Sequence, residues 1–200
     1  NDLMCDNEGN FWIMTNYNGV EIINNQLKRF EFYTIPTTNT QPETGRTEIR
    51  AFYEDNQKKI WLGTDKGLWI FDPASKNLEE YRPENMPPHR PDICCLLPSK
   101  EDLWIGTYKE GIYRLNMNTG KWKTTATHNK RHNNTQQRRI KSDQGHDGTI
   151  YVGTNIGLCR YRAETDNFLP IIQVGAMTAV TDILEDSHQH LWIATSNSGF

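Results

Sequence analysis

One short pattern recurs along this chain and constrains its fold more than any other feature. The clearest copy reads IWLGTDKGLWIFD at residues 60–72, where two apolar runs flank a polar turn that ends in Gly67. The runs are rich in β-branched and aromatic residues, which favour strands, so the pattern predicts a β-hairpin. Further copies of varying quality lie at residues 11–23, 103–116, 150–162 and 191–200. A pattern that recurs in this way predicts a repeat protein.

The spacing of the copies indicates the kind of repeat. Each copy has an aromatic residue in its first apolar run, and neighbouring copies start about 41–49 residues apart, which fits a propeller blade of four strands. We therefore expect an all-β fold, a β-propeller segment of four-stranded antiparallel blades, with about four and a half blades in one domain. The expected blades are 1–35 (partial), 49–82, 93–126, 140–172 and 180–200 (partial).

Two details favour stacked blades over a single open sheet. The second strand of a blade is apolar at consecutive positions, as at residues 60–62, which predicts burial on both faces. In a sheet with one solvent-exposed face, apolar and polar residues would alternate along the strand instead. A small residue also occupies one place in this strand in several copies, and such residues mark the close approach of another sheet. The small residues are Gly63, Gly106, Gly153 and Ala194, and the first copy differs in having Met14, so we expect its sheet to pack differently.

The pattern at residues 60–72, preceded by the Glu54-Asp55 turn, resembles the two-component regulator propeller repeat, and the resemblance spans essentially the whole chain. It implies the periplasmic sensor region of a hybrid two-component system histidine kinase/response regulator, within an inner-membrane protein of gut bacteria. Such regions have seven-bladed propellers followed by a β-sandwich, and their usual ligands are oligosaccharides. The resemblance thus implies that this segment binds an oligosaccharide and passes the signal to a kinase outside it. Its other partners would be neighbouring propeller or β-sandwich domains of the parent chain, with homodimerisation through that chain.

Two other functions stay open. A glycan-active propeller enzyme, sialidase- or lyase-like, would need two positioned carboxylates or a tyrosine nucleophile with its partner. No carboxylate stands out from turn and surface positions, and the turns at 6–9 and 147–149 resemble the Asp-box of sialidase propellers, which does no chemistry, so we expect a non-catalytic segment without a cofactor. The His188-x-His190 pair falls in an expected turn, which favours a solvated turn over a metal site. The second alternative is a protein-docking propeller scaffold, which an exposed apolar patch would favour.

Charge, hydropathy and cysteine content indicate which partners and which covalent links to expect. The chain has 22 Lys and Arg against 25 Asp and Glu, a formal net charge of −3, so we expect no nucleic-acid partner. Mean hydropathy is −0.77, and no apolar run approaches the ~18 residues of a membrane span, so we expect no direct membrane contact. The four cysteines, Cys5, Cys94, Cys95 and Cys159, show no C-x-x-C spacing, and we predict that all are free thiols.

A ligand is expected at one end of the blades. The blade-to-blade links and the turns between second and third strands share that end, and the links are long and irregular, as binding segments often are. The most basic link, residues 128–139, is either part of this site or a solvated loop. We expect an acidic oligosaccharide whose rings stack on tyrosine and whose charged groups bind arginine or lysine. The expected ligand-binding residues are Arg50, Arg90, Arg138, Arg139, Tyr17, Tyr108, Lys66 and Lys109.

Overall fold

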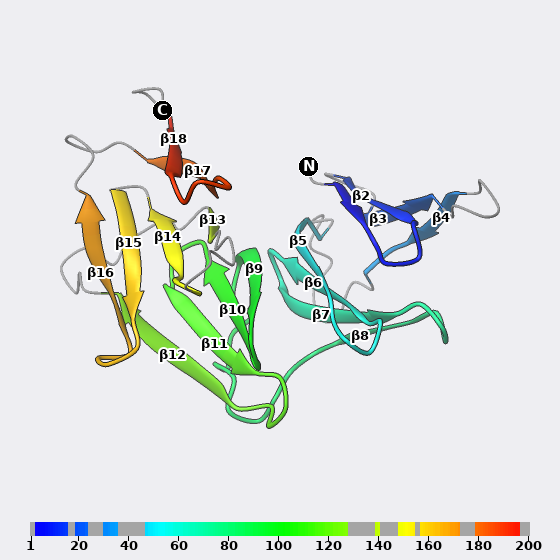
Figure 1. Cartoon of the computed structure of the whole chain (residues 1–200). Coiled ribbons are helices and arrows are strands. Elements are labelled where there is room, and N and C mark those ends of the chain that lie inside the picture. The colour runs from blue at the N-terminus through cyan, green and yellow to red at the C-terminus, as the bar shows by residue number, and fades with distance from the viewer. Residues whose placement is uncertain are drawn as a thin grey trace. The chain divides into compact units, whose positions relative to one another are not determined.

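The computed structural model describes residues 3–15, 19–23, 30–35, 47–127, 139–140, 148–154, 157–172 and 179–196. Within these residues the regular secondary structure is β-strand (Figure 1), and none of it is a helix long and apolar enough to cross a membrane. The chain forms two compact units, Asn1–Arg82 and Pro83–Phe200, and each is considered by itself.

The first unit contains two four-stranded antiparallel sheets, and in each sheet the strands follow one another in chain order. The first sheet consists of β1 (Leu3–Cys5), β2 (Phe11–Thr15), β3 (Gly19–Ile23) and β4 (Phe30–Tyr33). The second sheet consists of β5 (Ile49–Glu54), β6 (Ile60–Thr64), β7 (Gly67–Asp72) and β8 (Asn77–Glu80). These strands coincide closely with the apolar runs of the sequence, because each run supplies the β-branched and aromatic residues that a buried pleated surface needs.

The second unit repeats this order. The third sheet consists of β9 (Ile93–Ser99), β10 (Asp102–Thr107), β11 (Ile112–Asn116) and β12 (Trp122–Thr127). The fourth sheet consists of β13 (Arg139–Ile140), β14 (Tyr151–Thr154), β15 (Gly157–Arg162) and β16 (Asn167–Ile172), and the fifth of β17 (Val180–Glu185) and β18 (Leu191–Thr195). All pairs within these sheets are antiparallel, so the predicted all-β fold of four-stranded antiparallel sheets is confirmed.

One connection between sheets was not expected from the sequence. The outer strands β12 and β16 pair in parallel over Ala126–Asn167 and Thr127–Phe168, which joins the third and fourth sheets into one eight-stranded sheet. Both are fourth strands and run in the same direction, and their outer edges carry unpaired backbone groups. Where the two edges approach each other, a short parallel ladder satisfies those groups.

Burial of the second strands follows the prediction. All five residues of β6 are buried, and so are the last five of β10. Trp12 of β2 is 2% exposed and Trp104 of β10 is also 2% exposed. Side chains on both faces of β6 and β10 are therefore buried, and apolar cores lie between consecutive sheets within each unit.

The small residue predicted to mark a close approach does so in the fourth sheet. A Cβ added to Gly153 of β14 would lie 2.7 Å from Cγ1 of Val180 in β17, far inside van der Waals contact. In the first sheet Met14 takes this place and is 4% exposed, within the core shared with the second sheet. The four cysteines are free thiols, with Cys5 exposed, Cys95 buried and the other two half-buried.

Candidate functional site

In the second unit, the link before the third sheet meets the turn between β10 and β11. The backbone N–H of Tyr108 in this turn donates to the carbonyl of Asp92 in the link, at 2.8 Å. The imidazole Nε2 of His89 in the link lies 2.6 Å from Oε2 of Glu110 in the turn. The expected meeting of links and second-to-third-strand turns at one end of a blade is thus observed here.

We call the group His89, Arg90, Tyr108, Lys109 and Glu110 the link–turn cluster. The Lys109 ammonium lies 5.0 Å from the centre of the Tyr108 ring, within the range of a cation–π contact. The Glu110 carboxylate accepts a hydrogen bond from the Tyr113 hydroxyl at 2.8 Å, besides its contact with His89. The turn therefore combines an aromatic ring, an ammonium group and a carboxylate acceptor next to the link that contains Arg90.

Hydrogen bonds of a buried threonine stabilise the turn that carries the cluster. The buried Thr107 hydroxyl donates to the Gly111 carbonyl at 2.8 Å and accepts from the Glu110 N–H at 3.0 Å. Gly111 has a φ of 90°, which side chains with a Cβ rarely adopt, so glycine is required at the end of this turn. The backbone under Tyr108 and Lys109 is consequently well defined.

The first unit has a counterpart between the link before β5 and the β6–β7 turn. The Asp65 N–H donates to the Glu48 carbonyl at 3.1 Å, and the Glu48 N–H donates to Oδ1 of Asp65 at 2.8 Å. The Arg50 guanidinium forms an ion pair with Glu48, with Nη2 to Oε2 at 3.0 Å. Arg50 therefore already has a carboxylate partner, and Lys66 follows Asp65 in the same turn.

The structure sorts the eight residues expected from the sequence into three sets. Arg90, Tyr108 and Lys109 belong to the link–turn cluster, and Arg50 and Lys66 belong to its counterpart in the first unit. Arg139 begins β13, and its side chain lies outside the described residues, as do Tyr17 and Arg138. Sequence reasoning missed the acidic partners Glu48 and Glu110 and the imidazole of His89, although Glu110 lies in the same turn as two expected residues.

Of the two turns that resemble an Asp-box, the turn at Asp6 has a structural role, whereas Asp147 of the other lies outside the described residues. In the Asp6 turn, Oδ1 accepts the N–H groups of Glu8 and Asn10 at 2.9 and 2.8 Å, and Oδ2 accepts the Trp12 indole N–H at 2.8 Å. Burial raises the pKa of Asp6, but the hydrogen bonds from Trp12 and Asn10 outweigh it, so the pKa lies below its ordinary value. Each acceptor oxygen of Asp6 is thus used to hold the turn.

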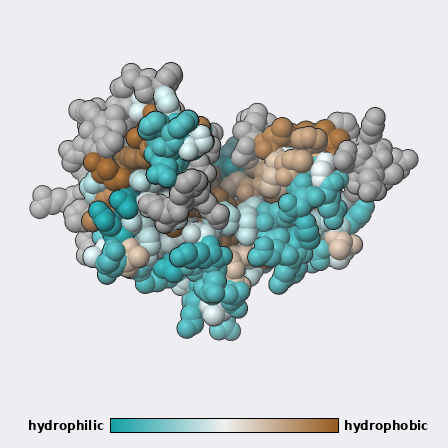
Figure 2. All heavy atoms as spheres, viewed as in Figure 1, coloured by the Kyte–Doolittle hydropathy of each residue, from teal (hydrophilic) through white to brown (hydrophobic). Residues whose placement is uncertain are grey.

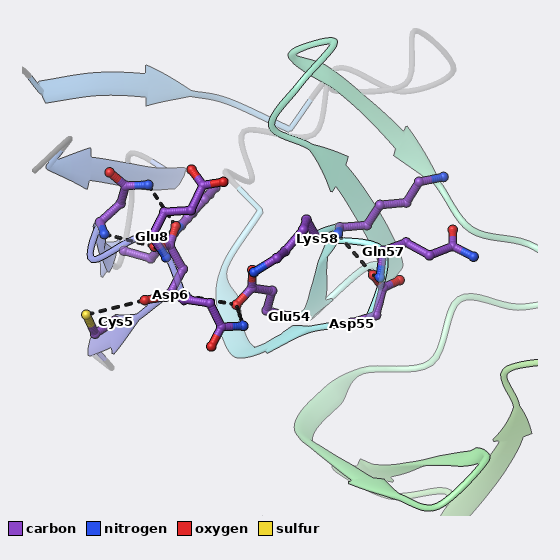
Figure 3. Close-up of polar contacts among 11 residues, drawn as sticks. Cys5, Asp6, Glu8, Glu54, Asp55, Gln57 and Lys58 are labelled. Atoms are coloured by element: carbon purple, nitrogen blue, oxygen red, sulfur yellow. Dashed lines mark hydrogen bonds and ion pairs between the residues drawn. The ribbon is translucent and has the colours of Figure 1, made fainter. Parts of the chain in front are cut away.

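The same arrangement occurs at two other turns between first and second strands. Asp55 accepts from Gln57 and Lys59 at 2.8 and 3.0 Å and from the Trp61 indole at 2.8 Å. Asp186 does the same with His188 and His190, both at 2.9 Å, and with the Trp192 indole at 2.9 Å. Figure 3 shows the Asp6 and Asp55 turns; Asn7, the residue after Asp6, donates through Nδ2 to Oε2 of Glu54 at 2.8 Å.

A tyrosine beside a carboxylate in the second unit also lacks catalytic character. The Tyr161 hydroxyl donates to Oδ1 of Asp166 at 2.7 Å, and the Arg114 guanidinium lies between Asp166, at 3.6 Å, and Asp102, at 2.6 Å. Lys123 forms a further ion pair with Asp166. Burial and the hydrogen bond to Asp166 raise the pKa of Tyr161 to about 12, which is the wrong direction for a nucleophile. This network instead ties the third sheet to the fourth.

The described residues contain no group of three or more His, Cys, Asp or Glu side chains that could hold a metal ion. A cavity of about 10 Å³ in the core of the first unit is lined by side chains that include Trp12, Leu62 and Phe71. It is far too small for a sugar and presents no polar surface, so it is a packing gap. Among the described residues, the link–turn cluster is therefore a candidate site with suitable chemistry at the surface.

Comparison with known proteins supports the propeller architecture. Residues 45–66 and 176–197 match the family model described as "Two component regulator propeller", and each matched segment contains one of the Asp–Trp turns. The chain therefore carries two-component regulator propeller repeats, as the resemblance of the sequence indicated. A comparison with curated proteins found no match.

Several solved structures share the fold. The extracellular domain of BT3049 from B. thetaiotaomicron, a proposed hybrid two-component system, is 21% identical with a TM-score of 0.75, and the match covers 100% of this chain and 26% of that one. The extracellular domain of BT4673 from the same organism, described as a proposed one-component system, is 19% identical with a TM-score of 0.76, covering 96% and 24%. PorZ, a surface component of the type-IX secretion system of Porphyromonas gingivalis, is 17% identical with a TM-score of 0.73, covering 99% and 31%. The chain thus spans about a quarter to a third of the length of these proteins.

Proposed function

We propose that this chain is a non-catalytic, ligand-sensing propeller segment of a periplasmic two-component sensor, and that it binds an oligosaccharide through the link–turn cluster. The observation that carries this proposal is that Tyr108, Lys109 and Glu110 lie in one turn, which the preceding link contacts through His89 and Asp92. A tyrosine ring offers a stacking surface for a sugar, Glu110 can accept sugar hydroxyls, and Lys109 with Arg90 can bind carboxylate or sulfate groups. The signal would pass to a kinase elsewhere in the parent chain.

The test is titration calorimetry of the 200-residue chain against neutral, uronic-acid-containing and sulfated oligosaccharides. We expect Tyr108→Ala and Lys109→Ala each to weaken binding roughly tenfold, since a lost charge-assisted bond or stacking contact is worth about 1.5 kcal/mol. Lys121→Ala is the matched control, because Lys121 is an exposed lysine in the β11–β12 turn, at the opposite end of the same sheet. An unchanged affinity in both cluster variants would place the site elsewhere, and cleavage of any sugar in the panel would replace the sensor with an enzyme.

A further inference from the structure

The turn of the link–turn cluster has a counterpart in the second sheet, and the two turns share their backbone structure. In the β6–β7 turn, the Thr64 hydroxyl donates to the Gly67 carbonyl at 2.8 Å and accepts the Lys66 N–H at 3.0 Å. The β10–β11 turn makes the same two bonds through its own threonine and glycine, and there the N–H donor is Glu110. Glu110 therefore takes the place of Lys66, so the fold does not require an acidic side chain at this position.

The residue two places after the glycine also differs between the two sheets. Tyr113 of β11 is 4% exposed, and its hydroxyl donates to Oε2 of Glu110 at 2.8 Å. The corresponding residue of β7 is Trp69, whose buried indole N–H has no hydrogen-bond partner among the described residues. A buried donor without a partner is costly, yet the second sheet forms the same turn with it. The bond between Tyr113 and Glu110 is therefore not a requirement of the strand and turn geometry.

This bond holds the Glu110 carboxylate in place. Burial and the hydrogen bond to Glu110 raise the pKa of Tyr113 above its ordinary value, so the phenol keeps its proton and remains a donor. The imidazole Nε2 of His89 lies 2.6 Å from the same Oε2. Two contacts from different segments, β11 and the link, therefore hold one oxygen of this carboxylate. Among the described residues, the other oxygen, Oε1, accepts no hydrogen bond.

A carboxylate held in this way can discriminate between ligands. An ionised carboxylate accepts hydrogen bonds and cannot donate them, so Oε1 can bind a hydroxyl or an amine but repels a second anion. The side chain of Glu110 is 29% exposed, so its charge is partly shielded from water and acts more strongly on a close neighbour. A flexible carboxylate could turn away from an anionic group, whereas Glu110 would lose both of its contacts by doing so.

We propose that Glu110 is a specificity-determining residue of the link–turn cluster, and that Tyr113 is its positioning residue. The sugar unit beside Tyr108 presents hydroxyl or amine donors to Oε1 of Glu110, and an anionic group of the ligand has to bind at Lys109 instead. The ligand class is thus an oligosaccharide that is uncharged or basic where it faces Glu110. This inference rests on the proposed function, because it concerns the ligand of the same site.

The test is titration calorimetry of the 200-residue chain with oligosaccharides of glucose and of glucuronic acid that share one length and linkage. Glu110→Gln should weaken binding of the glucose ligand about tenfold, because a charge-assisted hydrogen bond is much stronger than a neutral one. The glucuronic acid ligand should bind as before or more tightly, since the repulsion is removed. The ratio of the two dissociation constants should thus shift by at least about tenfold. Tyr113→Phe should shift it in the same direction by a smaller factor, because the carboxylate is then held less firmly.

Glu101→Gln is the matched control. Glu101 is exposed in the turn between β9 and β10, at the end of the third sheet away from the cluster, and the substitution removes the same charge. Its carbonyl accepts the N–H of Met117 in the β11–β12 turn at 2.8 Å, and Figure 2 shows hydrophilic residues gathered over that turn. The ratio of dissociation constants should stay at its wild-type value. Far-UV circular dichroism checks that each substitution leaves the fold intact.

The possible results separate this inference from the proposed function. Equal weakening of both ligands by Glu110→Gln indicates a structural role, and an unchanged ratio indicates no role; both overturn the inference and leave the proposed function standing. Binding of the glucuronic acid ligand alone also overturns it, because the glucose ligand presents the same ring hydroxyls. A wild type that binds neither ligand overturns the inference too, and the proposed function fails with it if the neutral, uronic-acid-containing and sulfated panel does not bind either.

Discussion

The Asp–Trp turns make a quantitative prediction about stability. Asp55 accepts three hydrogen bonds, two from the backbone of its own turn and one from the indole of Trp61, which is 6% exposed. Asp55→Ala removes all three acceptors and leaves the indole N–H buried without a partner. An unsatisfied buried donor costs about 1–3 kcal/mol, and each lost bond in the more exposed turn adds about 0.5 kcal/mol or more. We therefore expect the free energy of unfolding of the first unit to fall by roughly 2–4 kcal/mol.

A double-mutant cycle with Trp61→Phe isolates the indole bond. Phenylalanine removes the donor, so Asp55→Ala should cost less in that background, and the difference should be about 1–2 kcal/mol. Urea unfolding followed by far-UV circular dichroism is the suitable assay, since it does not depend on the altered fluorophore. Hydrogen exchange at the Gln57 and Lys59 amides should become faster in the alanine variant.

The control for this prediction is Asp72→Ala. Asp72 accepts the backbone N–H of Ala74 at 2.9 Å in the exposed β7–β8 turn, without an indole partner in the described structure. Its removal should cost clearly less than that of Asp55. If Asp55→Ala lies within about 0.5 kcal/mol of the wild type and shows no coupling to Trp61→Phe, the turn carboxylate does not hold the blade together and the reasoning is wrong.

Three further predictions follow from single positions. Lys58 has a φ of 66°, so Lys58→Gly should stabilise the chain by up to about 1 kcal/mol in urea unfolding, and a loss of stability would contradict this. Gly153→Ala should lower the free energy of unfolding because the added Cβ would clash with Val180. Adding Val180→Ala should recover part of that lost stability, whereas purely additive effects of the two substitutions would exclude the clash. The hydrogen bonds from the Trp192 indole and the His190 backbone lower the pKa of Asp186 to about 2, so its stabilising contribution should be present above about pH 4 and disappear as the pH falls through about 2. Carboxyl NMR titration measures this pKa directly, and Trp192→Phe should raise it.

The strands were predictable because their signal is local. An apolar run such as residues 60–64 specifies a buried strand wherever it lies, and repetition of the run supplies the period of the sheets. The Asp–Trp bond was not predicted. Asp55 and Trp61 are six residues apart, and this spacing alone does not show that the turn folds the carboxylate back onto the indole. The parallel pairing of β12 with β16 has no local signal, since it depends on how closely two sheet edges approach.

The site was less predictable for a related reason. Arg50 and Arg90 were chosen by charge and by their place near the links, and charge alone does not show which cations have acidic partners. The Arg50–Glu48 ion pair and the His89–Glu110 contact arise from side chains that meet only when a link folds against a turn. Sequence reasoning therefore predicted that links and turns meet at one end of the sheet, but it did not predict the acidic groups found there, and ligand binding at this end stays a prediction.

The turns at the two ends of a second strand differ in how strongly they restrict the residues that they contain. In the turn before β6, both oxygens of Asp55 accept hydrogen bonds from backbone and indole donors, so this carboxylate holds the turn. At the other end, the positive φ required by the turn is met by glycine, at 101° for Gly67 and 90° for Gly111. Because glycine meets this conformational demand, the residues before it, such as Tyr108, are free to differ between blades without strain. The residues of these turns can therefore differ from blade to blade, while the Asp–Trp turns hold the same local structure.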